Sequence, residues 1–315
     1  MDQLRSLRVF ARVIAEGSFA GAARALDMAP AVVTRAVAEL EEHLGARLLN
    51  RTTRRLALTE IGEAYLQRTR RILAELDDAD ALAGSSMKQP RGSLRVLCPP
   101  AFATHQLAKH LPRFRAKYPQ LRLEVATPGP VEMADENFDV SIVSVGQQSM
   151  QGDFVARRLA CSAFLVCAAP AYLDRRGRPA HPDDLMQHDG VLPAVSSVRR
   201  ELTLYRADHA RSDVSPIAVT IPTPPAVLST SHIDMILAAT IAGLGIAGLP
   251  SFVVEDAMRE GRLERVLPQW RGLALNLYAA VPTRKHLPTR TRAFVDFLVQ
   301  TFGGNDSDPW LADDG

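Results

Sequence analysis

The sequence predicts a small helical N-terminal region followed by a larger α/β region. Near the start of the chain, apolar residues such as Leu4, Leu7 and Phe10 recur at the three-to-four residue spacing of a helix face. Beyond Gly92, short β-rich runs alternate with helical stretches, which is the α/β pattern. A chain of 315 residues has room for two or three domains of this kind.

Composition limits the class of protein but not its partner. The formal net charge of +2 is too small to indicate a nucleic-acid partner, because what matters is whether basic groups cluster on one surface. The N-terminus lacks the pattern of a secretory signal, and the longest apolar stretch, residues 235–250, is shorter than the ~20 residues that a membrane crossing needs. We therefore expect a soluble, cytoplasmic protein with no membrane contact.

The first three helices predict a helix-turn-helix. The first helix ends at Gly17, a natural left-handed position, and Ser18 caps a second helix over residues 19–26. Only Asp27 and Met28 separate that helix from the next one, which spans residues 29–45. Two short helices joined by so tight a turn are typical of this DNA-binding motif.

The third helix has one apolar face and one nearly bare face. Val33, Val37 and Leu40 lie on the first, whereas Pro30 and Ala31 begin the second, followed by Thr34, Arg35 and Ala38. A major groove admits a helix only if nothing bulky blocks its approach, so we predict that the bare face enters DNA. Arg35 is the candidate for a guanine edge or a phosphate, and Thr34 for a base or phosphate oxygen. Ala29 cannot cap the first amides, which a phosphate or water then satisfies.

A basic stretch over residues 46–62 follows this helix. Four arginines occur before the first acid, Glu60, and two threonines are interleaved with them: Arg47, Arg51, Arg54 and Arg55, with Thr52 and Thr53. Clustered arginines are usually a solvated charge run. Directly after a helix-turn-helix, the same pattern favours a two-stranded wing that touches the DNA backbone.

Residues 18–62, SFAGAARALDMAPAVVTRAVAELEEHLGARLLNRTTRRLALTEIG, resemble the DNA-binding region of the LysR-type transcriptional regulators nearly end to end. The resemblance implies contacts near the start of the third helix and in the wing, and we add the cap of the second helix: Ser18, Ala29, Pro30, Ala31, Thr34, Arg35, Arg51, Thr52, Thr53 and Arg54. Many members carry a serine and often a glutamine where this chain has Ala29 and Pro30. We therefore expect fewer base contacts, with more weight on Arg35, phosphates and DNA deformability.

A connecting helix starts after Thr59, which caps it. Alternating spacings of four and three residues predict a short coiled coil through Tyr65, Thr69, Ile72, Leu76, Ala79 and Ala83. The alternative is a helix packed on its own domain, but the resemblance favours pairing of two chains. Residues 84–93 are the predicted hinge. The predicted domains are 1–58, a winged helix-turn-helix, 59–90, linker helix and hinge, and 91–302, the regulatory domain.

The α/β pattern rests on predicted strands at 93–98, 121–126, 138–145 and 162–169 and on helices at 104–118 and 231–243. Residues 170–190 and 237–268 resemble the family's regulatory domain, which implies a periplasmic-binding-protein-like fold of two α/β subdomains with a small-molecule effector between them. We assign subdomain I to 91–160 and 267–302 and subdomain II to 161–266. The polar tail, 303–315, is expected to be disordered. The family further implies a homodimer and a dimer of dimers, that is, a homotetramer.

The resemblance also implies an effector pocket lined by the loop after the first strand and by three other short segments: Pro100, Ala101, Phe102, Ala103 and Thr104, then Thr127, Val145, Gly146, Thr230 and Ser231. Many relatives have a serine or threonine at the position of Ala101, so an acidic effector loses one hydrogen bond here. Thr104 and free amides at the helix start can still hold an anion. Core packing or helix capping is the alternative role for each of these residues.

Several other patterns predict no chemistry. The GLGIAG run at 243–248 follows a helix rather than a strand, so it indicates a helix end and a buried strand instead of a dinucleotide site. Ser231, His232 and Asp234 lack the elbow motif of a nucleophile. His181 and His188 are interpreted as solvated loop histidines. We therefore predict no enzyme, cofactor or metal.

The three cysteines lack metal-ligand spacing and lie in apolar runs, which predicts buried thiols: Cys98, Cys161 and Cys167. A sensing role for Cys98, near the predicted pocket, is the alternative. The leading hypothesis is a DNA-binding regulator controlled by an effector. The competing hypothesis is a small-molecule binding protein or enzyme with a helical oligomerisation module.

Overall fold

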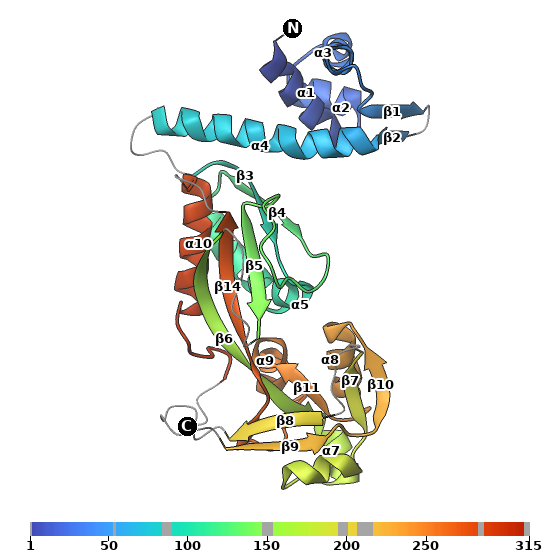
Figure 1. Ribbon diagram of the computed structural model, residues 1–315, viewed down its shortest axis with the longest axis vertical. Coiled ribbons are helices and arrows are strands. Elements are labelled where there is room, and N and C mark those ends of the chain that lie inside the picture. Colours follow the sequence, from blue (N-terminus) through green and yellow to red (C-terminus); the bar gives the residue numbers. More distant parts are fainter. Residues whose placement is uncertain are drawn as a thin grey trace. The chain divides into compact units, whose positions relative to one another are not determined.

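The computed structural model describes residues 2–52, 55–83, 90–146, 154–194, 201–206, 217–282 and 287–311. The chain divides into two compact units, Met1–Ser93 and Leu94–Gly315. We call them the N-terminal unit and the regulatory unit, and Figure 1 shows the elements of each.

The N-terminal unit contains the predicted helix-turn-helix, wing and long helix. Its elements are α1 (Gln3–Ala15), α2 (Phe19–Ala25), α3 (Pro30–Leu44), β1 (Leu49–Thr52), β2 (Arg55–Leu58) and α4 (Glu60–Ala83). Three predicted helix boundaries are confirmed. Gly17 has a φ of +63° at the end of α1, the Ser18 hydroxyl accepts from the Gly21 amide, and the Thr59 hydroxyl accepts from the Gly62 amide.

The first half of α4 packs on its own unit. The Tyr65 ring lies 6.1 Å from the Phe10 ring, and the side chains of Leu66 and Thr69 are buried. Ile72 is instead 48% exposed. The predicted coiled-coil face is therefore divided, because Tyr65 and Thr69 serve the domain core while Ile72 remains free for a partner helix. Pairing of two chains stays a prediction, as do the roles of Ala79 and Ala83, whose side chains are outside the description.

The regulatory unit has the predicted α/β pattern. Its helices are α5 (Pro100–Phe102), η1 (Ala103–Leu107), α6 (Ala108–Lys117), α7 (Pro170–Arg176), η2 (Pro182–Gln187), α8 (Ile233–Ile241), α9 (Ser251–Arg259) and α10 (Thr289–Phe302). Its strands are β3 (Gly92–Leu97), β4 (Leu121–Ala126), β5 (Val140–Val145), β6 (Phe154–Ala168), β7 (Gly190–Pro193), β8 (Glu201–Arg206), β9 (Ala218–Pro222), β10 (Ala226–Thr230), β11 (Ala247–Pro250), β12 (Glu264–Arg265), β13 (Trp270–Arg271) and β14 (Ala274–Pro282).

One long strand connects the whole unit. The largest sheet has the order β11-β6-β14-β5-β3-β4, and β12 also pairs with β6. Two smaller sheets, β13-β8-β9 and β10-β7, complete the far end of the unit. Because β6 runs from Phe154 to Ala168, it crosses from predicted subdomain I into predicted subdomain II without a break. The division into subdomains itself stays a prediction.

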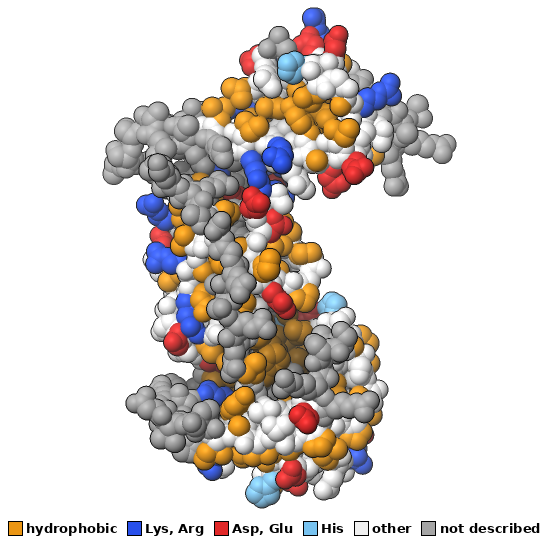
Figure 2. Space-filling view, in the orientation of Figure 1, with side chains coloured by type: hydrophobic (Ala, Val, Ile, Leu, Met, Phe, Trp, Pro, Cys, Tyr) orange, Lys and Arg blue, Asp and Glu red, His pale blue; other side chains and the backbone are white. Residues whose placement is uncertain are grey.

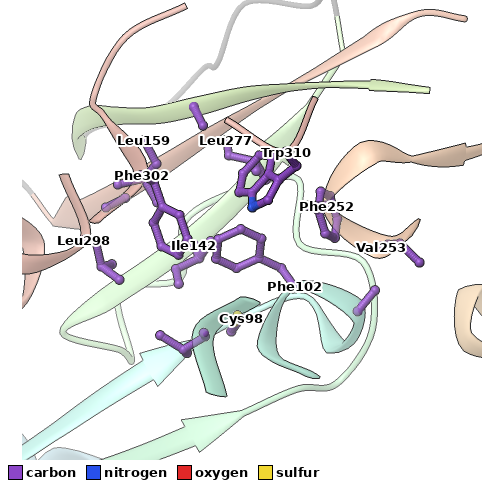
Figure 3. Packing of buried hydrophobic residues seen from close by; sticks show 14 of the residues in the cluster. Cys98, Phe102, Ile142, Leu159, Phe252, Val253, Leu277, Leu298, Phe302 and Trp310 are labelled. Carbon is purple, nitrogen blue, oxygen red and sulfur yellow. The ribbon is translucent and has the colours of Figure 1, made fainter. Parts of the chain in front are cut away.

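The largest hydrophobic core lies around Phe102, Ile142, Phe252 and Leu298, and Trp310 belongs to it (Figure 3). Trp310 is 7% exposed. The prediction of a disordered tail over residues 303–315 is therefore wrong for residues 303–311, because one large aromatic side chain holds an otherwise polar segment in place. Residues 312–315 lie outside the described part of the chain.

A second correction concerns His188, which is 6% exposed rather than solvated. Its Nδ1 lies 3.3 Å from the Tyr172 hydroxyl. Burial, followed by the nearby Arg176 charge, lowers the pKa of His188. The GLGIAG prediction is confirmed, since Gly243 follows α8 with a φ of +77° and β11 begins at Ala247.

Candidate DNA-binding surface and effector cleft

The start of α3 presents an uncrowded surface. Ala29 has an extended backbone and makes no capping bond, and Pro30 is the first helical residue. Ala29, Pro30, Ala31 and Arg35 are exposed, whereas Val33 points into the core with no exposed area. The predicted bare face is therefore confirmed as a free surface, with the helix amides and dipole at its start.

Arg35 and Thr34 carry the polar groups of this surface. The Arg35 side chain is 81% exposed, and its Nε donates to Glu39 Oε1 at 2.8 Å. An exposed pair of this spacing is worth only about 0.3–0.5 kcal/mol, less than the ~1–3 kcal/mol of a good base contact, so Glu39 does not hold Arg35 back from DNA. The Thr34 hydroxyl donates to the Pro30 carbonyl at 3.0 Å and keeps its lone pairs for a base amine.

The Ser18 hydroxyl caps α2 and can also donate a hydrogen bond. It is exposed, and its oxygen accepts from the Gly21 amide at 3.0 Å. A hydroxyl used as an acceptor still has its O–H to donate to a phosphate.

The wing is fixed to α3 by one carboxylate. Oε1 of Glu41 accepts from the amides of Leu48 at 2.8 Å and Leu49 at 3.0 Å, at the start of β1, which pairs antiparallel with β2. These bonds hold the wing at a set distance from the helix. Thr53 and Arg54 lie outside the described residues, and only the backbone of Arg51 and Thr52 is described, so their DNA contacts stay predictions.

The second candidate site lies in the regulatory unit, where two sets of parallel strands end. β3 pairs parallel with β5, and β7 pairs parallel with β10. α5 follows β3, and α8 follows β10. His105 Nε2, in η1 after α5, lies 2.7 Å from Asp234 Oδ1, near the start of α8. The helical segments that follow the carboxyl ends of both strand pairs therefore meet at this contact. Open α/β folds bind ligands outside the carboxyl ends of their strands, which makes this region the candidate site.

Figure 2 shows a hollow with hydrophobic side chains on its walls in this part of the regulatory unit. Of the predicted lining, Pro100, Ala103, Val145, Gly146 and Thr230 are partly buried at element ends, and Thr104, Thr127 and Ser231 are exposed. Thr230 is already engaged, because its hydroxyl accepts from the His232 amide at 3.2 Å. The Gly146 carbonyl accepts from the Asn276 side chain at 3.3 Å.

Phe102 and Ala101 depart from the predicted lining. Phe102 has no exposed area, and its ring packs against Phe252 and Phe302 at 5.5 and 5.2 Å (Figure 3). Ala101 is 6% exposed and belongs to the same core. The prediction that Phe102 faces an effector is therefore wrong for this conformation, since a phenyl ring gains more by packing in the core than by lining a polar cleft.

His105 is a functional candidate that sequence reasoning missed, and its partner Asp234 was considered there only as part of a nucleophile pattern. They are separated by 129 positions and come from the two different predicted subdomains. His232 lies close to the same carboxylate, with its Nδ1 3.9 Å from Asp234 Oδ2. No local pattern marks such a pair, because each residue alone is an ordinary polar side chain near a helix start.

The buried thiols lack reactive character. Cys98 has no exposed area, and burial raises its pKa far above the ordinary value. Burial likewise raises the pKa of Cys167 to about 12. A thiol that stays protonated is a weak nucleophile, which counts against sensing by Cys98. Within the described residues, no group of three or more His, Cys, Asp or Glu is placed to hold a metal, and no helix is long and apolar enough to cross a membrane.

Comparison with known proteins gives a family match for each of the two units. Residues 4–63 match the model of the bacterial regulatory helix-turn-helix protein of the lysR family, and residues 87–303 match the LysR substrate binding domain. A relative named HTH-type transcriptional regulator CrgA, from Neisseria meningitidis, is 33% identical over 95% of this chain and 97% of its own. The HTH-type transcriptional activator AaeR of Escherichia coli is 32% identical over 96% of this chain and 94% of its own.

Solved structures share the fold over nearly the whole chain. The structure of CrgA is 30% identical, covers 95% of this chain and 98% of its own, and gives a TM-score of 0.58. The full-length structure of the Vibrio cholerae virulence activator AphB, at 24% identity and a TM-score of 0.57 over 95% of this chain and 99% of its own, shares the fold. The family and these relatives are transcriptional regulators, which sets aside the enzyme hypothesis. The chain belongs to the LysR family of bacterial transcriptional regulators.

Proposed function

We propose that this regulator seats the first turns of α3 in the major groove of double-stranded DNA, with Arg35 on a guanine edge or phosphate and the wing on the backbone. The observation that carries the proposal is the exposed, uncapped start of α3 beside the exposed Arg35 guanidinium. Ala29, Pro30 and Ala31 permit close approach because they are small or compact. The amides behind them and the Ser18 hydroxyl are suited to phosphates.

The effector-binding function is proposed for the cleft between the strand ends. A small molecule there touches both predicted subdomains, near Thr104 and Thr127 on one side and Ser231 on the other. It can regulate the protein only by binding two assembly states with different affinities. Because His105 and Asp234 already join the two sides, an effector competes with this contact or adds to it.

We further propose a homodimer that assembles into a dimer of dimers in the cytoplasm. Two α3 helices related by a two-fold axis address the two halves of an operator, whereas one winged helix alone binds weakly. Ile72 on α4 is exposed and apolar, which suits helix pairing. Size-exclusion chromatography with light scattering tests this, and a monomer at working concentration contradicts it.

The test of DNA binding measures affinity by fluorescence anisotropy at several salt concentrations. The probe is a labelled DNA fragment from upstream of the gene that encodes this chain. Affinity is expected to fall steeply with salt, because neutralised phosphates release counterions. Arg35→Ala is expected to lose about 1–3 kcal/mol if the side chain reads a base. Arg122→Ala, which removes an exposed arginine on β4 of the regulatory unit, is the matched control for loss of charge. Equal affinities for both variants remove Arg35 from the contacts.

The test of the cleft is a thermal-shift screen of small molecules. A ligand at a hundred times its dissociation constant stabilises the folded chain by about 2.7 kcal/mol. A hit is then tested against Asp234→Asn, which alters the cleft, and against Asp183→Asn, an exposed carboxylate elsewhere in the same unit. A hit that binds both variants equally well lies outside the proposed cleft.

A further inference from the structure

The segment Gly303–Leu311, which we call the C-terminal strap, runs along one edge of β6. The Gly304 amide donates to the Leu159 carbonyl at 2.9 Å, and the Cys161 amide donates to the Ser307 carbonyl at 3.0 Å. Further along the strand, β11 pairs with residues Phe164 to Cys167 of β6. The strap therefore pairs with the part of β6 on which predicted subdomain I passes into predicted subdomain II.

Asp308 anchors the strap at a buried polar site. Its carboxylate accepts from the Ala163 amide at 2.7 Å and from the Ser251 hydroxyl at 2.8 Å. Ser251 and its neighbour Ser162, whose hydroxyl oxygens are 2.7 Å apart, have no exposed area. Burial raises the pKa of Asp308. A carboxylate is kept in such surroundings only when several donors meet it, so this is a built contact and not an incidental one.

Trp310 is the apolar anchor. Its ring lies 6.2 Å from Phe102, 5.7 Å from Phe252 and 5.9 Å from Phe302 (Figure 3). Phe102 and Phe302 belong to predicted subdomain I, and Phe252, on α9, to predicted subdomain II. The indole thus packs against both subdomains at once.

The strap is fastened on both sides of the crossing. On one side, Asp306 pairs with Arg158 at 2.7 Å and Gly304 bonds to Leu159. On the other side, Asp308 bonds to Ala163 and Ser251. A rotation of one subdomain against the other about this stretch of β6 changes the distance between the two sets of anchors. Such a rotation must strain the strap or break the contacts that Asp308 and Trp310 make with the rest of the unit.

We propose that the C-terminal strap is a conformational latch. It holds the two predicted subdomains in one mutual orientation while Asp308 and Trp310 keep their buried contacts, and it lets the subdomains reorient when both sets of contacts break. The latch acts where β6 crosses between the predicted subdomains, and the proposal does not depend on which effector binds. If the proposed cleft binds an effector, the strap sets how readily that cleft opens and closes.

The test measures the distance between the subdomains directly. Spin labels are placed on Ala116→Cys, an exposed position on α6, and on Asp183→Cys, an exposed position on η2, in a Cys161→Ala background. The full-length chain is diluted with unlabelled chain so that only labels within one protomer are measured by pulsed electron paramagnetic resonance. Trp310→Ala and Asp308→Ala are compared with the parent.

Phe114→Ala is the matched control for a weakened core. Phe114 is buried and packs on Phe294 and Phe297, all within predicted subdomain I, and it has no ring contact with Trp310 among those of the described residues. The parent and this control are expected to give one narrow distance distribution, and both strap variants a broadened or shifted one. Unchanged distances in folded strap variants, or equal broadening in Phe114→Ala, overturn the latch.

If Trp310→Ala does not fold, Asp308→Ala decides, because it leaves the indole in place. DNA binding by each variant is measured separately with the upstream fragment. The distance measurement tests the latch and the affinity measurement tests the proposed function. A variant that changes one and not the other therefore shows which of the two proposals fails.

Discussion

Gly62, in the first turn of α4, lies against Leu48, the residue that precedes β1 of the wing. A Cβ added at this position would lie 2.0 Å from the carbonyl oxygen of Leu48 and 2.8 Å from its carbonyl carbon. That same oxygen accepts from the Thr59 amide at 3.0 Å. Gly62→Ala therefore forces apart the start of the wing and the start of α4.

The expected cost follows from two opposing effects. At an open helical site, replacing glycine with alanine stabilises by roughly 0.5–1 kcal/mol. Here a normal contact of carbon with oxygen is about 3.3 Å or more, so Leu48 must withdraw by more than ~1 Å. Overpacking of this kind costs about 1–3 kcal/mol, and loss of the Thr59 bond adds about 1 kcal/mol. We expect a net destabilisation of roughly 1–3 kcal/mol.

The assay is denaturant unfolding of the full chain together with hydrogen exchange of peptides that cover β1 and the start of α4. Faster exchange is expected there, with weaker DNA binding because the wing is displaced. Gly248→Ala is the control, since a Cβ at Gly248 meets nothing within 4 Å. A Gly62→Ala chain as stable as wild type, with unchanged exchange at β1, refutes the steric reasoning.

Three further predictions concern other parts of the chain. Glu39→Gln releases Arg35 from an ion pair worth about 0.3–0.5 kcal/mol, so the affinity for DNA should rise about twofold. Fluorescence anisotropy measures this affinity, and a fall would mean that Glu39 positions Arg35 for binding. Because the folded pKa of His188 lies below its ordinary value near 6.5, its contribution to stability is present above that pH and lost as pH falls through the folded pKa. Melting temperatures between pH 7.5 and 5.5 should therefore fall less in His188→Gln than in wild type, and parallel curves would count against the burial effect. Alkylation of the native chain followed by mass spectrometry should modify the half-buried Cys161 before Cys98, and early modification of Cys98 would restore it as a sensing candidate.

The local features of the N-terminal unit were predictable because each depends on near neighbours in the chain. Gly17 ends a helix through its own backbone freedom, and Ser18 and Thr59 cap helices through amides three residues away. The bare face of α3 follows from the helical period alone. The strands β3, β4 and β5 follow from short apolar runs bounded by polar residues.

Other features depend on which distant segments meet. His188 is buried because Tyr172 lies beside it, and Phe102 faces the core because Phe252 and Phe302 complete an aromatic cluster there. The contact between His105 and Asp234 joins positions with no shared local pattern. Composition alone gave the wrong answer for the tail, since one tryptophan and one aspartate outweigh its polar residues once partners are in place.

The sequence by itself determined the helix-turn-helix, the α/β regulatory unit and the exposed start of α3, because helix periodicity, capping and strand patterning are short-range properties of the chain. Only the tertiary structure decided that Phe102 packs in the core, that His105 meets Asp234 and where the C-terminal strap lies. Those depend on contacts between residues far apart in sequence, whose free energy exists only when the fold brings them together.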